Sequence, residues 1–237
     1  MPWSAWAVHA LTASGALLGF LMMTAIGAGD YRQAFVWMAV ATAIDSGDGV
    51  LARAARVKER VPTFDGGRLD DIVDYLTFVF APAYLVYHAR LTPDSLTLLV
   101  IAAMLLSSAY GFSQTAAKTA DYFFTGFPSY WNIVVFYLVV VGAPATVNAA
   151  VLIGLAVLVF VPIAYVYPSR TPTLRAPTLA LGVLWAVLVV LMIWQYPDVS
   201  RPVLSVSFVF PVYYVILSLV LDVRRKQNEV GRGFSRK

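Results

Sequence analysis

The sequence predicts an all-α integral membrane protein with about eight transmembrane helices and both termini in the cytoplasm. Three observations support this fold class: the composition, a series of long apolar segments, and the placement of the basic residues. Of the 237 residues, 60% are hydrophobic and only 13% are charged, and the mean hydropathy is +0.75. Such values are typical of membrane proteins and exclude an ordinary soluble domain. We expect one transmembrane domain, residues 1–237.

Eight apolar segments approach the roughly 20 residues that cross a bilayer as a helix. They are residues 6–27, 31–51, 69–87, 96–112, 127–142, 147–166, 177–194 and 203–221. In the first segment, Gly15 and Gly19 are four residues apart, and we expect them to serve close helix packing. The sequence contains no cysteine, which excludes disulfides and thiolate metal sites.

The basic residues support this count of spans. With the N-terminus in the cytoplasm, the outer loops hold only Arg32, Arg90 and Arg201 of the 17 Lys and Arg residues. This asymmetry follows the positive-inside rule. The basic tail, residues 222–237, then lies at the cytoplasmic membrane surface, where contact with anionic headgroups is its simplest role.

Four aspartates at the ends of two predicted helices are the strongest functional signal. Asp45 and Asp48 are three residues apart, and Asp70 and Asp74 are four apart, so each pair shares a helix face. The predicted orientation places both pairs at the cytoplasmic side, joined by the hairpin 54–65. Carboxylates in apolar segments are costly and mark functional sites.

Four carboxylates at one depth repel one another unless protons or cations neutralise them. Two divalent ions would balance the charge, and oxygen ligands without Cys or a nearby His favour Mg²⁺ or Mn²⁺. Gly49 and Ala52 leave space beside the acids for a flat ligand, and Arg53 is placed to clamp a phosphate. Together these residues suggest a nucleotide diphosphate as the ligand.

Ion pairing with arginines is the competing interpretation of these acids. Arg53, Arg56 and Arg68 lie near them in the sequence, and for any single aspartate a structural ion pair competes with metal binding. For four acids in register with small residues, we favour the metal site. Asp71 lies off the face of Asp70 and Asp74, and Asp65 precedes the helix, so we expect both to cap a helix or face solvent.

The stretch 45–74 resembles the signature of the CDP-alcohol phosphotransferases, D-x-x-D-G-x-x-A-R and then, after a spacer, G-x-x-x-D-x-x-x-D. The matching residues are Asp45, Asp48, Gly49, Ala52, Arg53, Gly66, Asp70 and Asp74. The resemblance implies that the four aspartates hold two divalent ions and that Asp74 is also the general base. It implies catalytic roles for Asp70 and Arg53, a nucleotide-binding set of Gly49, Ala52, Arg53 and Gly66, and a homodimer.

The spacer 54–65 is longer than is usual in that family. Its length, the eight predicted spans and the segment 121–131 look like the bacterial phosphatidylcholine synthase branch. This resemblance implies transfer of a phosphatidyl group from CDP-diacylglycerol to choline with release of CMP. It also implies an inner-membrane enzyme with a cytoplasmic active site, and no nucleic-acid partner.

A choline acceptor would require aromatic faces, which a carboxylate could assist, because its quaternary ammonium makes no ordinary hydrogen bond. The segment after the fourth predicted span supplies candidates: Asp121, Tyr122, Phe123, Tyr130 and Trp131. Tyr and Trp are also enriched at membrane interfaces, so an interfacial role stays open for each aromatic residue.

Two basic residues, Arg170 and Lys118, are candidates for binding a lipid phosphate. An ordinary positive-inside role is the alternative for both. His9 and His88 are isolated in the sequence, and we expect them to pack at the membrane interface.

Three other functions remain open. Within the same chemistry, the acceptor alcohol could be serine, inositol or a glycerol phosphate. A transporter is an alternative from another class, since acids within membranes also mark ion pathways, although these acids gather at one face and not at the midplane. The third is an inactive membrane scaffold.

Overall fold

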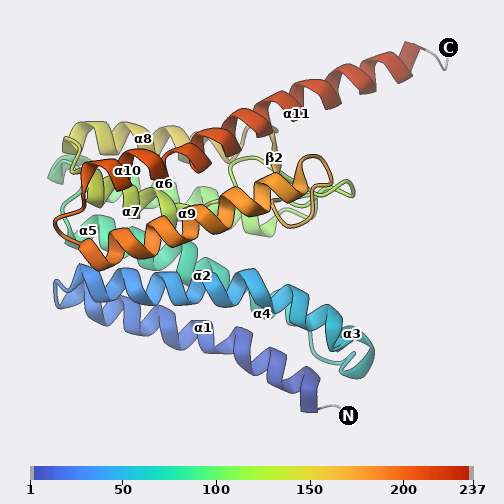
Figure 1. The fold of residues 1–237 in the computed structure, drawn as a ribbon, viewed down its shortest axis with the longest axis horizontal. Helices are drawn as coiled ribbons and strands as arrows, with labels where there is room; N and C mark the ends of the chain where they lie inside the picture. The colour runs from blue at the N-terminus through green and yellow to red at the C-terminus, as the bar shows by residue number, and fades with distance from the viewer. Residues whose placement is uncertain (1–2, 235–237) are drawn as a thin grey trace. The chain divides into compact units, whose positions relative to one another are not determined.

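The computed structural model describes the backbone of residues 3–234, and side chains as far as residue 227. The described chain is mostly helical (Figure 1), which confirms the predicted all-α class. It divides into two compact units: Met1–Phe112 with Ser129–Ile153, and Ser113–Pro128 with Gly154–Lys237. Arg236 and Lys237 of the predicted basic tail lie outside the described residues.

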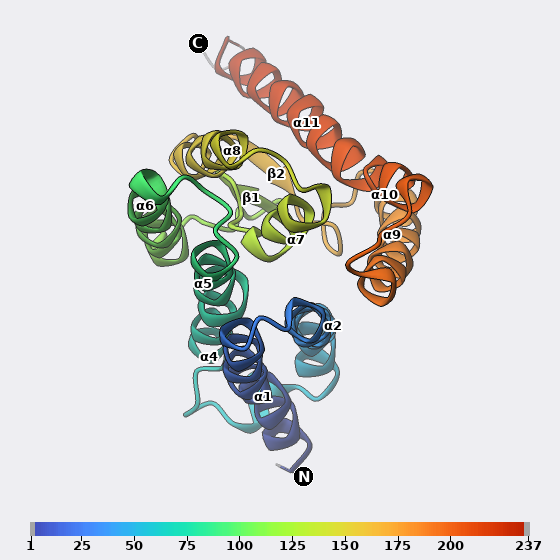
Figure 2. The same cartoon turned by 90° about the vertical axis from the view of Figure 1, so that its left-hand side faces the viewer.

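The first unit begins with a helical hairpin. Helices α1 (Trp3–Gly27) and α2 (Tyr31–Ala54) lie side by side in both views (Figures 1 and 2). The turn between them uses Gly29, whose φ of +75° suits a residue without a side chain. Asp30 then caps α2, because its Oδ1 accepts a hydrogen bond from the Gln33 N–H at 3.0 Å.

The short helix α3 (Val57–Arg60) follows, and then a long helical stretch that packs against α1. This stretch consists of α4 (Gly66–Asp74), the π-helix η1 (Tyr75–Phe80) and α5 (Ala81–His88). The expected capping role of Asp65 is confirmed, since its Oδ1 accepts hydrogen bonds from the N–H groups of Gly67 and Arg68, both at 3.1 Å. Pro82 explains the π-helical turn, because its nitrogen donates no hydrogen bond to the preceding turn and its ring crowds it.

Three more helices contribute to the first unit. They are α6 (Asp94–Ser113), α7 (Trp131–Val141) and the first part of α8 (Ala145–Leu158). Trp131 is fully buried, and its Nε1–H donates to the Ser108 Oγ at 2.7 Å. The Asn148 amide donates to the Leu91 carbonyl at 2.9 Å. Buried polar groups thus tie α7 to α6, and α8 to the connection that precedes α6, where apolar packing alone sets no register.

The second unit contains an antiparallel pair of strands, β1 (Phe123–Thr125) and β2 (Ala164–Val166), with Phe123 opposite Val166. Its helices are α9 (Arg175–Gln195), α10 (Arg201–Ser207) and α11 (Val209–Phe234). Helix α11 packs along β2, and two side chains of α11 accept hydrogen bonds from backbone N–H groups of β2. The Ala164 N–H donates to Asp222 Oδ1 at 2.9 Å, and the Val166 N–H donates to Ser218 Oγ at 3.1 Å.

The fifth and sixth predicted spans are too long at one end. Helix α7 begins at Trp131 and not at residue 127, and α8 ends at Leu158, so residues 164–166 are a strand and not a helix. Backbone pairing explains both limits, since the N–H groups of Gly126 and Phe127 donate to the carbonyls of Ile163 and Leu158.

Each of the eight predicted segments nevertheless contains helix. Among the described residues, α1, α2, α6, α9 and the helical stretch Arg201–Gln227 are long and apolar enough to cross a membrane, while α7 and α8 are shorter. The protein is therefore a multi-pass membrane protein. The count of eight spans and the cytoplasmic termini stay predictions.

Candidate active site

The two helices of the signature bring its acids together. Asp45 comes from α2, and Asp70 and Asp74 come from α4. One carboxylate oxygen of each lies within 4.8 Å of the others, and all three side chains are partly buried. Spacing of this order allows one divalent ion to bind all three carboxylates, because such ions hold oxygen ligands at about 2.0–2.6 Å.

The fourth acid, Asp48, is buried, with only 6% of its surface exposed. It lies on α2 and accepts a hydrogen bond from α1. The Thr12 hydroxyl on α1 donates to its Oδ2 at 2.7 Å, whereas the Val8 carbonyl is 3.3 Å from the same hydroxyl. A hydroxyl has one proton to donate, so the shorter contact to the carboxylate takes it. Thr12 therefore fixes the direction of the Asp48 carboxylate.

All four aspartates line one small cavity of about 10 Å³. Thr12 and Gly15 of α1 line it as well. This volume suits an object the size of one water molecule or ion, so a larger ligand must lie outside it. The donors are carboxylate and hydroxyl oxygens, which are the ligands that Mg²⁺ and Mn²⁺ prefer. The residues present therefore fit a divalent cation without naming it.

Gly15 and Gly19 set the separation between α1 and the helix that carries Asp70 and Asp74. A Cβ atom on Gly15 would lie 2.5 Å from the Val73 Cγ1, and one on Gly19 would lie 2.9 Å from the Leu76 Cδ2. Both distances are shorter than carbon–carbon contact. The expected packing role of this pair is confirmed, and Gly15 also borders the cavity.

The predicted nucleotide-binding residues fall into two groups, one on α2 and one at the start of α4. Gly49 and Arg53 are exposed on α2, where a Gly49 Cβ would lie 3.5 Å from the Arg53 guanidinium. Ala52 packs partly buried against the apolar cluster of Ala5, Val57 and Val61. None of the three borders the acidic cavity. A ligand bound by Arg53 would thus lie outside this cavity.

Gly66 begins α4 and touches the first helix. A Cβ there would lie 2.7 Å from the His9 Cε1, so only glycine fits without displacing the imidazole. His9 is 6% exposed and its ring contacts Trp6 and Phe64, while its expected place at the membrane interface stays a prediction. His88 packs against Tyr84 and Tyr87 on α5.

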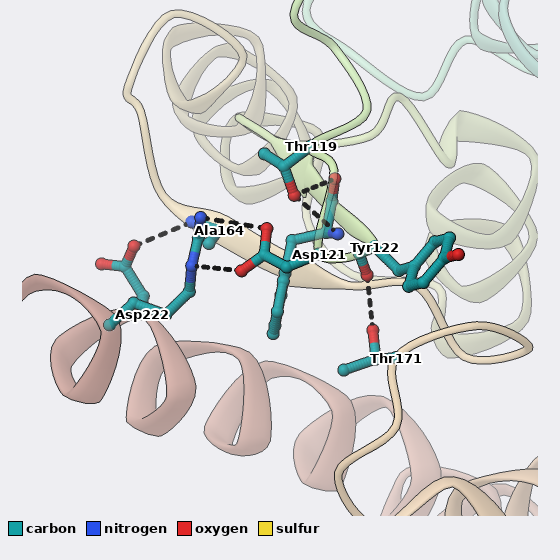
Figure 3. A network of polar contacts seen from close by, with 8 residues as sticks. Thr119, Asp121, Tyr122, Ala164, Thr171 and Asp222 are labelled. Carbon is teal, nitrogen blue, oxygen red and sulfur yellow. Dashed lines mark hydrogen bonds and ion pairs between the residues drawn. The ribbon is translucent and has the colours of Figure 1, made fainter. Parts of the chain in front are cut away.

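Three of the five choline-pocket candidates lie in the second unit, where they have other partners (Figure 3). Asp121 forms a two-point ion pair with Arg225 on α11, with oxygen–nitrogen distances of 2.9 and 3.2 Å. The same guanidinium lies 5.0 Å from the centre of the buried Phe123 ring. The Tyr122 carbonyl accepts a hydrogen bond from the Thr171 hydroxyl at 2.7 Å. The Arg225 contacts fix Asp121 and Phe123 on α11, and the Thr171 contact holds Tyr122 to the segment before α9.

Tyr130 and Trp131 belong to the first unit, where Tyr130 precedes α7 and Trp131 is fully buried. The lipid-phosphate candidates are in the second unit. Arg170 lies over two rings, 5.7 Å from the centre of Tyr122 and 5.8 Å from that of Tyr167. The exposed Lys118 forms a backbone bridge with Phe124. Arg170 and Tyr122 thus occupy one aromatic and cationic cluster.

The sequence interpretation missed two residues that organise these units. Thr12 is one turn before Gly15 on the same helix face, and that spacing was the available signal. Asp222 follows the last span, and Lys226 four residues later binds its Oδ2 at 2.7 Å. An acid followed by a lysine at this spacing typically forms a helical ion pair, but the bond from the strand to Asp222 carries no sequence signal.

The fold and the acidic cluster define a multi-pass helical membrane protein with a site suited to divalent cations. No protein-family model matches the chain, but curated relatives do. It is 36% identical to the phosphatidylcholine synthase of Rhizobium johnstonii, covering 92% of this chain and 90% of the relative. It is 37% identical to that of Legionella pneumophila, covering 91% and 87%, and 35% identical to that of Pseudomonas aeruginosa, covering 93% and 92%.

The chain belongs to the phosphatidylcholine synthase family. The identity exceeds one third over nearly the full length of both proteins, so it covers the acidic helices as well as the second unit.

Proposed function

We propose that this protein is a CDP-diacylglycerol–choline phosphatidyltransferase that makes phosphatidylcholine and releases CMP. The observation that carries the proposal is the cluster of four aspartates from two helices, in a chain that belongs to the phosphatidylcholine synthase family. The donor's diphosphate needs countercharge, and the acceptor's hydroxyl needs a base. Both requirements match the residue types in the cluster.

The reaction is a direct displacement at the lipid-linked phosphorus. The choline oxygen forms a new bond to that phosphorus while the bond to the CMP oxygen breaks, and the electron pair of the broken bond leaves with CMP. Asp74 takes the hydroxyl proton, and Arg53 carries countercharge for the departing phosphate. Two divalent ions, Mg²⁺ or Mn²⁺, held by Asp45, Asp48, Asp70 and Asp74 would neutralise charge on the phosphates.

The remaining residues bind the two substrates. Gly49, Ala52 and Gly66 would border the nucleotide together with Arg53. The choline ammonium requires aromatic faces, and Tyr122 is the exposed aromatic residue among the predicted set. We retain Asp121, Phe123, Tyr130 and Trp131 as candidates, and Arg170 and Lys118 for the lipid phosphate. The protein would work as a homodimer, and as one catalytic domain, in the bacterial inner membrane with this site facing the cytoplasm.

The experiment that tests the proposal is an acceptor comparison. Purified protein in detergent receives CDP-diacylglycerol, Mn²⁺ and one labelled alcohol: choline, serine, inositol or glycerol 3-phosphate. We expect label in lipid only with choline, together with an equal amount of CMP. Incorporation of another alcohol in place of choline would refute the acceptor, and solute flux in liposomes without CMP release would favour a transporter.

A further inference from the structure

Three aromatic side chains form a cluster where the N-terminal end of α1 meets the start of α4. The ring centres of Trp6, His9 and Phe64 are 5.8 Å apart for Trp6–His9, 5.4 Å for Trp6–Phe64 and 4.5 Å for His9–Phe64. Trp6 is 46% exposed and Phe64 is 38% exposed, whereas His9 is buried between them. The cluster therefore combines two partly exposed aromatic side chains with one buried imidazole.

The imidazole has a polar atom that the protein does not satisfy. The Nε2 of His9 is buried, and no described residue forms a hydrogen bond with it. Buried nitrogen and oxygen atoms are paired in the great majority of cases, and exceptions point to a functional role or a bound molecule. Packing alone would be served as well by a phenyl ring, which has no such atom.

The aromatic cluster lies close to the acidic site along both α1 and α4. His9 contacts Gly66, which is one turn before Asp70 on α4. On α1, His9 is one turn before Thr12, which holds Asp48 at 2.7 Å. The imidazole thus touches α4 one turn before Asp70, and on α1 it lies one turn before the residue that holds Asp48.

We propose that Trp6, His9 and Phe64 form the subsite for the base of the nucleotide donor. A pyrimidine is flat and has both donors and acceptors on its edge, so it can stack on an aromatic face and bond to an imidazole nitrogen. Choline and acyl chains lack this combination. That the base is cytosine follows from the proposed function, on which this inference rests. The residues that would recognise the base lie outside the signature.

The test is CMP binding to the full-length protein, followed by tryptophan fluorescence. CMP is expected to change the emission of wild-type protein, and Trp6→Phe is expected to remove most of that change. Trp194→Phe is the matched control, because Trp194 is 74% exposed in the second unit, and it should keep the change. A Trp6→Phe protein that retains the full CMP response would overturn the proposal.

The histidine is tested with His9→Phe, which keeps an aromatic ring but removes the nitrogens. Loss of one hydrogen bond to the base corresponds to roughly tenfold weaker CMP binding, and the preference for CMP over UMP should fall with it. The KM for CDP-diacylglycerol should rise while the KM for choline stays constant. His88→Phe, which alters the other histidine, should bind CMP as wild type does.

The outcomes separate this inference from the proposed function. Wild-type CMP affinity in His9→Phe would make His9 a packing residue and refute the subsite. Should His9→Phe fold poorly, Trp6→Phe at an exposed position decides the question. Normal phosphatidyl transfer with a CMP signal independent of Trp6 would refute the subsite alone, whereas absence of both CMP binding and transfer would refute both proposals.

Discussion

Replacing Gly15 with alanine should push α4, which carries Asp70 and Asp74, away from α1 and slow catalysis. The new Cβ would lie 2.5 Å from the Val73 Cγ1, which is about 1 Å short of carbon–carbon contact. Because Val73 lies between Asp70 and Asp74 on α4, movement of this helix displaces both carboxylates from Asp45. Misplacement of about 1 Å can cost on the order of 100-fold in rate, and overpacking of this kind costs about 1–3 kcal/mol of stability.

The assay is CMP release from CDP-diacylglycerol and choline, measured beside the thermal midpoint of each variant. Gly154→Ala is the matched control, because a Cβ at this exposed helical position meets nothing within 4 Å. The double variant Gly15→Ala with Val73→Ala removes the clashing methyl group and should recover much of the lost rate. Wild-type turnover in Gly15→Ala, or no recovery in the double variant, would refute the reasoning.

Three further predictions concern the acids and their supports. Thr12→Val should destabilise the protein by about 1–3 kcal/mol, because Asp48 loses its hydrogen bond. Thr12→Ser keeps the hydroxyl and should unfold at nearly the wild-type temperature. Equal stability of the two variants would contradict the role of the Thr12 hydroxyl. Mn²⁺ at about 100 times its Kd should add about 2.7 kcal/mol of stability, and unchanged Mn²⁺ stabilisation in Asp70→Asn would contradict the metal site. Asp121→Asn should lower the thermal midpoint by weakening the Arg225 pair; a rise in the KM for choline without that loss would instead assign Asp121 to choline binding.

Spacing along the chain was enough to predict the acidic cluster. Asp45, Asp70 and Asp74 meet because helical periodicity puts the two acids of each helix on one face, and the connection 54–65 folds the second helix back beside the first. The packing of Gly15 and Gly19 was also predictable, since small residues four apart allow helices to approach closely. Both features depend on local geometry, which the sequence expresses directly.

The second unit was less predictable, because its contacts join residues far apart in the chain. The strands pair Phe123 with Val166, and Asp222 receives the Ala164 N–H across 58 positions. The apolar run 147–166 predicts one helix, but backbone pairing of its last residues with β1 ends α8 at Leu158. Tertiary hydrogen bonds outweighed apolar periodicity there.

The same reason accounts for the choline candidates. Asp121 and the aromatic candidates were grouped because they are close together in the sequence. Closeness in the sequence does not specify which side chains contact one another in the fold. The structure gives Asp121 an arginine from α11 and buries Trp131 in the other unit. Recognition of the acceptor therefore has to be tested residue by residue.

The central claim is that the four-aspartate cluster carries phosphatidyl transfer to choline. Its most direct test measures CMP and labelled phosphatidylcholine together in wild-type protein, in Asp74→Asn and in Asp71→Asn. Asp71 is the matched control, because it is an exposed aspartate on the same helix and does not line the cavity. We predict equal amounts of both products from wild type and Asp71→Asn, and almost none from Asp74→Asn. Undiminished CMP release by Asp74→Asn would contradict the account.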